Sequence, residues 1–524
     1  MLIHALEFLV FWLLLKPSGL LVLSPWQGAR ETSHLEAILA GLIGWSLLAL
    51  LWSFFAPLAF FPALFALALL PLWRYRRQLW PGWPLLALAL LFAAYATWPS
   101  AVPDDGAYYG QTLEIFRRFG LIPGQGNIAP RLAFASAFHA LQAAFYWPQW
   151  HSYFALAPFL LLVWTAHLLS ALRAQTSLYA LILLLASPLL LFLGTAPSPD
   201  VVVFLLGAVL IEKRYFSAWR PAPDQILALT ALFWLFKPTL ALFALAFLFL
   251  ADWQKPWRAA NLLALAGLSL LVGVKDLYLT GYLLFPMLDW TVGGLPWQIP
   301  PELYAAQSAA LPKAFYGVDL RSDAPFWFQQ WRAAPLKAFL LVFTLCLNLG
   351  ALWLAFRQRA FRPWAVFLLF FTLVWSLSGG FRLGMHVFWP LAALIAMRFV
   401  PWLRTPPWLP YGIGAALTLA IFWPGYHLEA LVANPFYQRL ETFQSRYWLR
   451  PASEKTVPLA KAPAPGVEHL KEPAADDFCW YRCFPCSNRQ RFVSDEVLHT
   501  YPLQRASLSG RDRYYFYRKK TTAP

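Results

Sequence analysis

The stretch AILAGLIGWSLLALLWSF, residues 37–54, carries no charged side chain and is close to the length of one membrane crossing. A transmembrane α-helix needs about 20 consecutive apolar residues to cross the hydrocarbon layer. The segment before it, residues 1–23, is also apolar, with Lys16 near its middle. It lacks the basic start and the small-residue cleavage site of a signal peptide, so we expect a retained segment.

The composition extends this interpretation to the whole chain. Of 524 residues, 60% are hydrophobic and 13% are charged, whereas about 25% of residues in a soluble domain are charged. A soluble fold would need a larger core than this length can enclose. The composition therefore predicts a polytopic membrane protein.

Breaking the chain at proline, glycine and charge predicts an all-α fold of about 12 to 14 transmembrane helices. The apolar segments are residues 1–23, 37–54, 56–72, 84–98, 151–172, 177–194, 201–211, 225–236, 238–251, 260–274, 337–356, 364–378, 384–399 and 409–424. Segments 201–211 and 225–236 hold roughly a dozen residues each, too few for a full crossing. They predict broken or half-length helices that neighbouring protein shields.

The net charge of +16 comes from basic residues in short connections between apolar segments. Those assigned to the cytoplasm are Arg74, Arg76, Arg77, Arg173, Lys213, Arg214, Arg220, Lys255, Arg258, Arg357, Arg359, Arg362 and Arg404. Because they are scattered rather than clustered, we expect membrane lipids and no nucleic acid as partners. The long connections 99–150 and 275–336 then form outer loops, on the periplasmic side of a bacterial inner membrane.

Two regions follow: a membrane domain over residues 1–424 and a periplasmic tail over residues 425–524, with a Pro-rich linker at 457–473. Cys479, Cys483 and Cys486 lie in that tail. Three cysteines without matching partners are a weak zinc signal. An oxidising periplasm favours one disulfide, between Cys479 and Cys486, with Cys483 left over.

The first outer loop opens with PDDGAYY, residues 103–109. Asp104 and Asp105 are adjacent carboxylates directly after an apolar segment, which suits a catalytic base or a metal ligand at the membrane face. Helix capping is the alternative. Tyr108 and Tyr109 are of the kind that lines a sugar or lipid-headgroup site.

Asp200, in the turn Ser198-Pro199-Asp200, is predicted on the same face. It either caps the next helix or adds a second carboxylate to one cavity. Asp105 and Asp200 could share a divalent cation such as Mg²⁺ or Mn²⁺, or one could act as base while the other orients substrate. His139 lies on the stretch 132–146, a predicted re-entrant or interfacial helix, and packing is its simpler interpretation.

Several basic and aromatic residues are predicted at this face. Lys237 separates two apolar segments and is either a snorkelling anchor or a counter-ion for a lipid phosphate. Lys275 precedes Asp276 at the start of the second outer loop, and the two could pair with each other. Arg382 would suit bidentate phosphate binding, with an outer anchor as the alternative. The other candidate substrate-binding residues are Tyr282 and His386.

Over residues 30–425 the pattern resembles the GT-C superfamily of membrane glycosyltransferases, close to bacterial relatives of the mannosyl and aminoarabinose transferases. The matching elements are Asp104-Asp105, Ser198-Pro199-Asp200, Phe236-Lys237-Pro238-Thr239, residues 275–286 and Gly380-Phe381-Arg382. The resemblance implies a polyprenyl-phosphate sugar donor, a glycan, lipid or protein acceptor, and inverting transfer. It assigns the base to Asp104 or Asp105 and donor phosphate binding to Lys237 and Arg382.

Three other functions fit parts of the pattern. A transporter or flippase of lipid-linked glycans needs charges near the middle of the bilayer, whereas the candidates here lie at one face. An O-antigen polymerase or ligase would use an outer loop with arginines and histidine. Loop 275–336 offers Arg321 and Arg332 but no histidine. A structural envelope protein is the third alternative.

Overall fold

The computed structural model describes most of the chain up to residue 305. The described residues are 2–27, 32–96, 108–128, 130–146, 155–172, 177–185, 187–217, 219–238, 244–285, 290–302, 304–305, short stretches between 346 and 395, residue 412, 503–507 and 513–517. Of the sequence predictions, those on Asp104, Asp105, Arg382, His386, Cys479 and Cys486 lie outside these residues.

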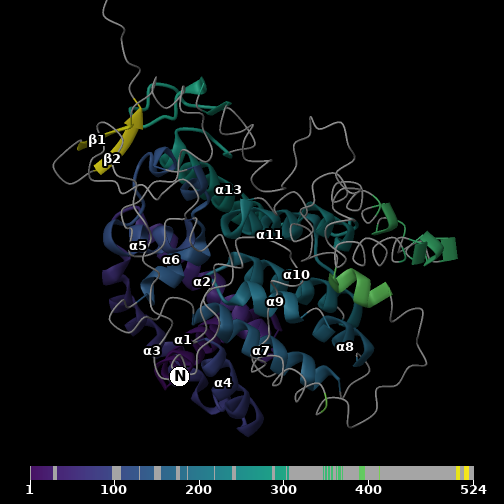
Figure 1. Ribbon diagram of the computed structural model, residues 1–524. Helices are drawn as coiled ribbons and strands as arrows, with labels where there is room; N and C mark the ends of the chain where they lie inside the picture. Colours follow the sequence, from purple (N-terminus) through teal and green to yellow (C-terminus); the bar gives the residue numbers. More distant parts are fainter. Residues whose placement is uncertain are drawn as a thin grey trace, which may run out of the picture.

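The described part is mostly helical (Figure 1). Its α-helices are α1 (Leu2–Gln27), α2 (His34–Ser53), α3 (Leu69–Tyr75), α4 (Trp83–Tyr95), α5 (Gly110–Phe119), α6 (Ala137–Ala144), α7 (Leu156–Ala171), α8 (Ser177–Leu185), α9 (Ser187–Gly194), α10 (Pro199–Phe216), α11 (Pro223–Phe236) and α13 (Ala259–Thr280). Its 3₁₀ helices are η1 (Leu58–Ala68), η2 (Arg76–Gln78), η4 (Gln125–Asn127), η5 (Pro130–Phe134) and η7 (Leu245–Leu250).

Helix α2 occupies the middle of the packing and contacts α1, α6, α7 and α10. Ser33 caps its start by accepting a hydrogen bond from the backbone N–H of Glu36 (3.2 Å). It meets α1 closely through small residues: a Cβ on Gly41 would lie 1.9 Å from the carbonyl oxygen of Leu15. Only glycine fits at this position, because the backbones of α1 and α2 approach each other closely, as small residues allow between membrane helices.

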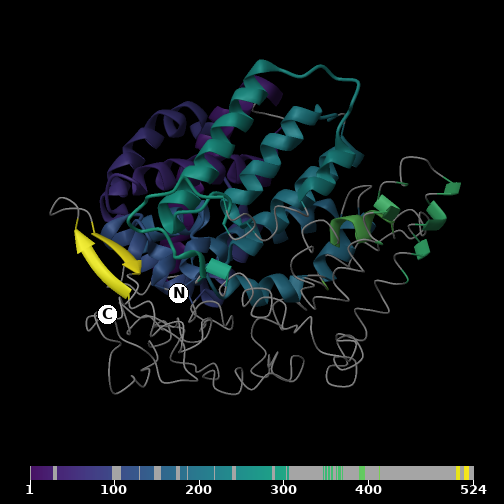
Figure 2. The ribbon, with the colours of Figure 1, turned by 90° about the horizontal axis from the view of Figure 1, so that it is seen from above.

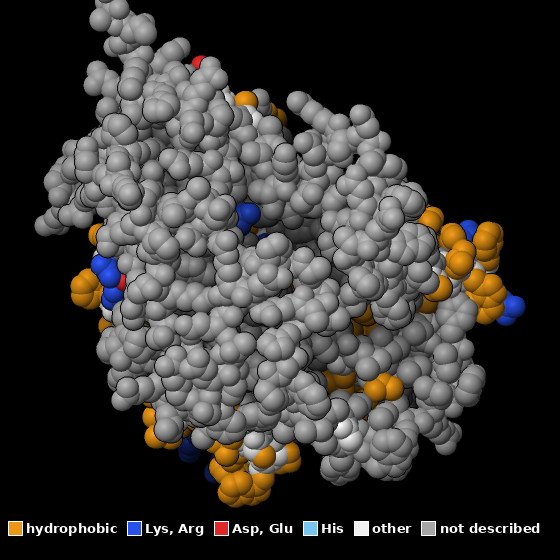
Figure 3. Space-filling view, viewed as in Figure 1, with side chains coloured by type: hydrophobic (Ala, Val, Ile, Leu, Met, Phe, Trp, Pro, Cys, Tyr) orange, Lys and Arg blue, Asp and Glu red, His pale blue; other side chains and the backbone are white. Residues whose placement is uncertain are grey.

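Four helical segments of the described part are long and apolar enough to cross a membrane: 2–23, 34–53, 58–78 and 259–280. Three shorter apolar helices are 83–95, 156–171 and 223–236. Large hydrophobic side chains are exposed on several of these, among them Leu70, Trp73 and Leu263. Figure 3 shows hydrophobic side chains at the edges of the molecule, as expected where lipid tails cover a surface.

Helices α10, α11 and α13 alternate in direction, so that their ends lie at two opposite ends of the body (Figure 2). At one end, which we name the site end, α10 begins while α11 and α13 finish. There the Gly124 N–H donates to the carbonyl of Tyr278 (2.9 Å). At the opposite end, which we name the basic end, α10 finishes while α11 and α13 begin. There the Asp252 N–H donates to the carbonyl of Pro221 (2.7 Å). Among the described residues, three of the predicted basic connections lie at this end, with Arg76, Lys213 and Lys255 as examples.

Several predicted boundaries change. Segment 201–211 was expected to be a short helix, which is wrong: α10 has 18 residues, because the polar run after Ile211 continues its last turns. Residues 99–150 were expected to be an outer loop with one helix at 132–146. Helix α6 lies within that stretch and all its residues are buried, whereas α5 is an additional helix that was not expected. The second outer loop was expected from residue 275, whereas α13 continues to Thr280.

The tail holds a two-stranded hairpin, so the all-α prediction is wrong for this segment. Strand β1 (Leu503–Ser507) pairs antiparallel with β2 (Arg513–Tyr517), with Leu503 opposite Tyr517. Tyrosine and phenylalanine favour strands, and the sequence between the strands contains Gly510 and Asp512, which favour turns. The backbone of β2 lies near η4, at the site end (Figure 1).

Candidate functional site

The start of α10 positions the first charged residue of the site. Ser198 is the N-cap and Pro199 the first helical residue, an arrangement that fixes where the helix begins. The Ser198 hydroxyl donates to Oδ2 of Asp200 (3.0 Å) and lies 3.3 Å from the Asp200 backbone nitrogen. The Asp200 side chain is fully buried. The prediction that Asp200 caps this helix is wrong, because Ser198 is the N-cap and Asp200 lies in the first turn.

The amine of Lys237 donates to Oδ1 of Asp200. Lys237 follows the last residue of α11 and is 7% exposed, so this pair joins α10 to α11 inside the protein. The prediction of a snorkelling anchor is wrong, because the amine points to a buried carboxylate and not to water. Removing either partner would leave a buried charge without compensation.

A second buried pair lies at the end of α13. The Lys275 amine lies 2.5 Å from Oδ1 of the adjacent Asp276, and both side chains are buried. The indole N–H of Trp234, on α11, donates to Oδ2 of Asp276 (3.4 Å). The predicted pairing of these two residues is therefore confirmed, and it connects α13 to α11.

His139 lies among these charges. It is fully buried on α6. Its ring centroid lies 4.9 Å from that of Tyr109 and 6.4 Å from that of Tyr108. Ser136 Oγ accepts a hydrogen bond from the backbone N–H of His139 (3.1 Å) and lies 3.0 Å from its Nδ1. The Ser136 hydroxyl can donate to Nδ1 or accept from it, depending on which ring nitrogen carries the proton. Within the described residues, Nε2 has no hydrogen-bond partner.

Burial is the main reason why the pKa of His139 falls from 6.5 to about 3. The charge of Lys237 lowers the pKa further and Lys275 contributes in the same direction, whereas the Pro197 backbone and Asp200 raise it. His139 is therefore a buried, neutral ring near pH 7.

The site end thus brings together five predicted residues: Tyr108, Tyr109, Asp200, Lys237 and Lys275. Tyr282 has another role, because its hydroxyl donates to the carbonyl of Ile299 (2.8 Å) and its ring stacks on Tyr304. It fixes the chain after α13. His139 is the central residue that the sequence interpretation set aside as packing, and its Ser136-x-x-His139 capping pattern was the available signal.

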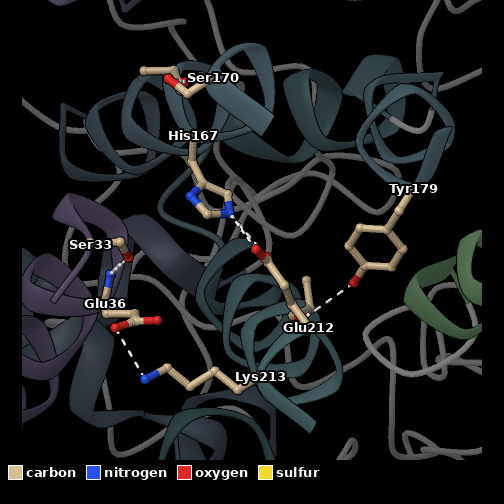
Figure 4. Close-up of polar contacts among 9 residues, drawn as sticks. Ser33, Glu36, His167, Ser170, Tyr179, Glu212 and Lys213 are labelled. Atoms are coloured by element: carbon tan, nitrogen blue, oxygen red, sulfur yellow. Dashed lines mark hydrogen bonds and ion pairs between the residues drawn. The ribbon is translucent and has the colours of Figure 1, made fainter. Parts of the chain in front are cut away.

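A second polar cluster lies at the basic end and was not expected from the sequence. His167 of α7 points toward Glu212 of α10 (2.9 Å), while Lys213 reaches Glu36 of α2 (3.1 Å) (Figure 4). The four side chains are between 18% and 22% exposed. Together they join three helices, and the described residues here contain no set of three metal-ligating side chains.

A protein-family model described as a domain of unknown function, DUF8201, matches residues 1–389. The chain belongs to this family. The DUF8201 match includes both polar clusters and ends before the tail hairpin. Neither the search of curated proteins nor that of solved structures gave a match.

Proposed function

We propose that this protein transfers a sugar from a polyprenyl-phosphate donor to an acceptor hydroxyl at the site end, on the periplasmic side of a bacterial inner membrane. The observation that carries the proposal is the gathering of Lys237, Lys275 and neutral His139 at one end of an apolar helical body. A lipid-linked substrate needs that combination: an apolar surface for its chain and donors for its phosphate.

The two lysines are suited to a phosphate because each amine already has a carboxylate partner that holds it in a fixed position. Lys237 has Asp200 and Lys275 has Asp276, so both cations are held in place before a substrate arrives. In a site of low dielectric constant, each contact with a phosphate oxygen is stronger than the same contact in water.

The reaction would be a direct displacement. The acceptor hydroxyl loses its proton to the carboxylate of Asp105 or Asp104, and its oxygen bonds to the anomeric carbon. The bond from that carbon to the phosphate oxygen breaks, and polyprenyl phosphate leaves with the electron pair. Lys237 and Lys275 stabilise the charge on the departing phosphate. Inversion follows because attack and departure occur on opposite faces of the sugar.

A divalent cation shared by Asp105 and Asp200 fits this geometry poorly. Both carboxylate oxygens of Asp200 already have donors, the Lys237 amine and the Ser198 hydroxyl. No step of the proposed reaction therefore uses a metal.

Binding of polyprenyl monophosphate tests the phosphate site. Purified protein in detergent is titrated with the lipid, and Lys237→Gln is compared with Lys213→Gln, which removes a paired lysine at the basic end. Loss of a charged hydrogen bond should weaken binding on the order of tenfold in the first variant and leave it unchanged in the second. Equal binding by both variants would remove the basis of the proposal.

Release of polyprenyl phosphate from a radiolabelled polyprenyl-phosphate hexose tests the chemistry. Membrane extract supplies acceptors, and Asp105→Asn should abolish release while Asp252→Asn, at the basic end, should not. Tight binding of the donor without any cleavage of the bond to phosphate would instead favour transport of lipid-linked glycans.

A further inference from the structure

The sequence WRYRRQLWPGW, residues 73–83, forms a connection at the basic end that we name the arginine turn. It contains three arginines and no acidic residue. Helix α3 ends within it, η2 follows, and α4 begins at Trp83 after Gly82, whose φ of 79° lies in the region that glycine favours. Tyr75 packs against Leu20 and Ala37, beside the start of α2.

The inner side of the arginine turn is fixed to the body by α1. The Lys16 amine donates to the carbonyl of Gln78, and the Trp12 indole donates to the carbonyl of Leu79 (2.6 Å). Both donors are buried. The turn is therefore held in one position and its outer side chains have a defined arrangement.

The outer side presents cations and indoles together. Arg74, Arg76 and Arg77 are exposed, and the exposed indoles beside them are Trp73 (67%), Trp80 (62%) and Trp83 (75%). The guanidinium of Arg76 lies over the Trp73 ring, 5.4 Å from its centroid. Within the described residues, these three guanidinium groups make one hydrogen bond, from Arg76 Nη1 to the Trp73 carbonyl (3.0 Å).

This combination matches the headgroup layer of a membrane. Tryptophan is enriched where apolar helices meet the lipid–water boundary, and the arginine turn joins the segment 58–78 to α4, both of them apolar. Guanidinium groups bind phosphate oxygens through paired hydrogen bonds. With no carboxylate in the turn, the local charge favours an anion, and the exposed indoles favour one that belongs to a lipid.

We propose that the arginine turn binds the phosphodiester headgroup of an anionic phospholipid in the leaflet at the basic end. Arg74 and Arg77, whose guanidinium groups make no hydrogen bond within the described residues, supply the donors, and Trp80 and Trp83 pack against the glycerol and upper acyl region. The site is independent of the sugar-transfer site, because it lies at the opposite end of the helices.

The test uses the full chain in dodecylmaltoside with phosphatidylglycerol or phosphatidylcholine added, and counts bound lipids by native mass spectrometry. Wild-type protein should retain phosphatidylglycerol in preference to phosphatidylcholine. The variant Arg74→Gln/Arg76→Gln/Arg77→Gln should bind phosphatidylglycerol on the order of tenfold to a hundredfold more weakly, given the usual contribution of basic residues near anionic lipid. If that variant does not fold, the single changes Arg74→Gln and Arg77→Gln should each weaken binding about several-fold.

The matched control is Arg220→Gln/Lys255→Gln/Arg258→Gln, which removes the same charge from two neighbouring connections at the basic end, those before α11 and before α13. It should retain the preference for phosphatidylglycerol. Unchanged binding by the arginine-turn variants would overturn the proposal, and so would an equal loss in the control, since net charge alone would then explain the effect.

Discussion

Acidification should destabilise this protein through His139. The ring is fully buried, its Nδ1 lies 3.0 Å from the Ser136 hydroxyl, and Lys237 acts on it as a nearby cation. Protonation would place a second cation in the same buried region. The native state therefore holds the neutral ring, whereas the unfolded chain takes up a proton at the ordinary pKa of histidine.

The direction and size of the stability change follow from the pKa values of His139 in the folded and unfolded states. The folded pKa of about 3 lies below the ordinary 6.5, so the unfolded state binds more protons between these limits and stability falls as the pH falls. From pH 7 to pH 5 the loss is about 2 kcal/mol, because each pH unit below 6.5 costs about 1.4 kcal/mol. Near pH 7 the contribution of His139 to the loss of stability is close to zero.

The assay is denaturant unfolding in detergent micelles at pH 7 and pH 5, for wild-type protein and for His139→Gln. Glutamine keeps a polar side chain near Ser136 but does not titrate. The wild-type protein should lose about 2 kcal/mol more than the variant on acidification, since other groups titrate equally in both. Equal losses in the two proteins would refute the buried, neutral state of His139.

Two further changes test the buried pair and the helix packing. Asp200→Asn should cost about 3 to 5 kcal/mol of unfolding free energy, because it leaves the buried charge of Lys237 uncompensated. Adding Lys237→Met should recover part of that loss. A double variant as unstable as Asp200→Asn alone would show that the pair has another role. Gly41→Ala should destabilise the protein by at least about 1 kcal/mol, since its Cβ would meet a carbonyl oxygen of α1 at 1.9 Å. The control is Gly44→Ala, since a Cβ at Gly44 meets nothing within 4 Å. Thermal unfolding should show a loss of stability for Gly41→Ala and little change for Gly44→Ala.

Local sequence information predicted the helices well where one apolar run makes one helix. The expected segments 37–54 and 225–236 correspond to α2 and α11 within a few residues. It failed where polar residues belong to a helix, as at the last turns of α10 and at Lys275 in α13. Hydropathy marks the ends of an apolar run, whereas a helix continues as long as its backbone hydrogen bonds do.

The roles of the charged residues could be predicted only in part. Lys275 and Asp276 are neighbours in sequence, and their pairing was predicted. Lys237 and Asp200 are 37 positions apart, and each had an acceptable local interpretation as an anchor or a cap. Which of these alternatives applies depends on the distance between α10 and α11, and a single sequence does not contain that distance.

The sequence by itself determined the class of the protein and the division of its polar residues. Low charge and long apolar runs predict a membrane-embedded helical chain, and alternate basic connections predict two different ends. Only the tertiary structure decided that His139 lies between two buried ion pairs and that α1 fixes the arginine turn. These features depend on side chains from distant segments meeting inside the packed body, where burial gives each contact its energy.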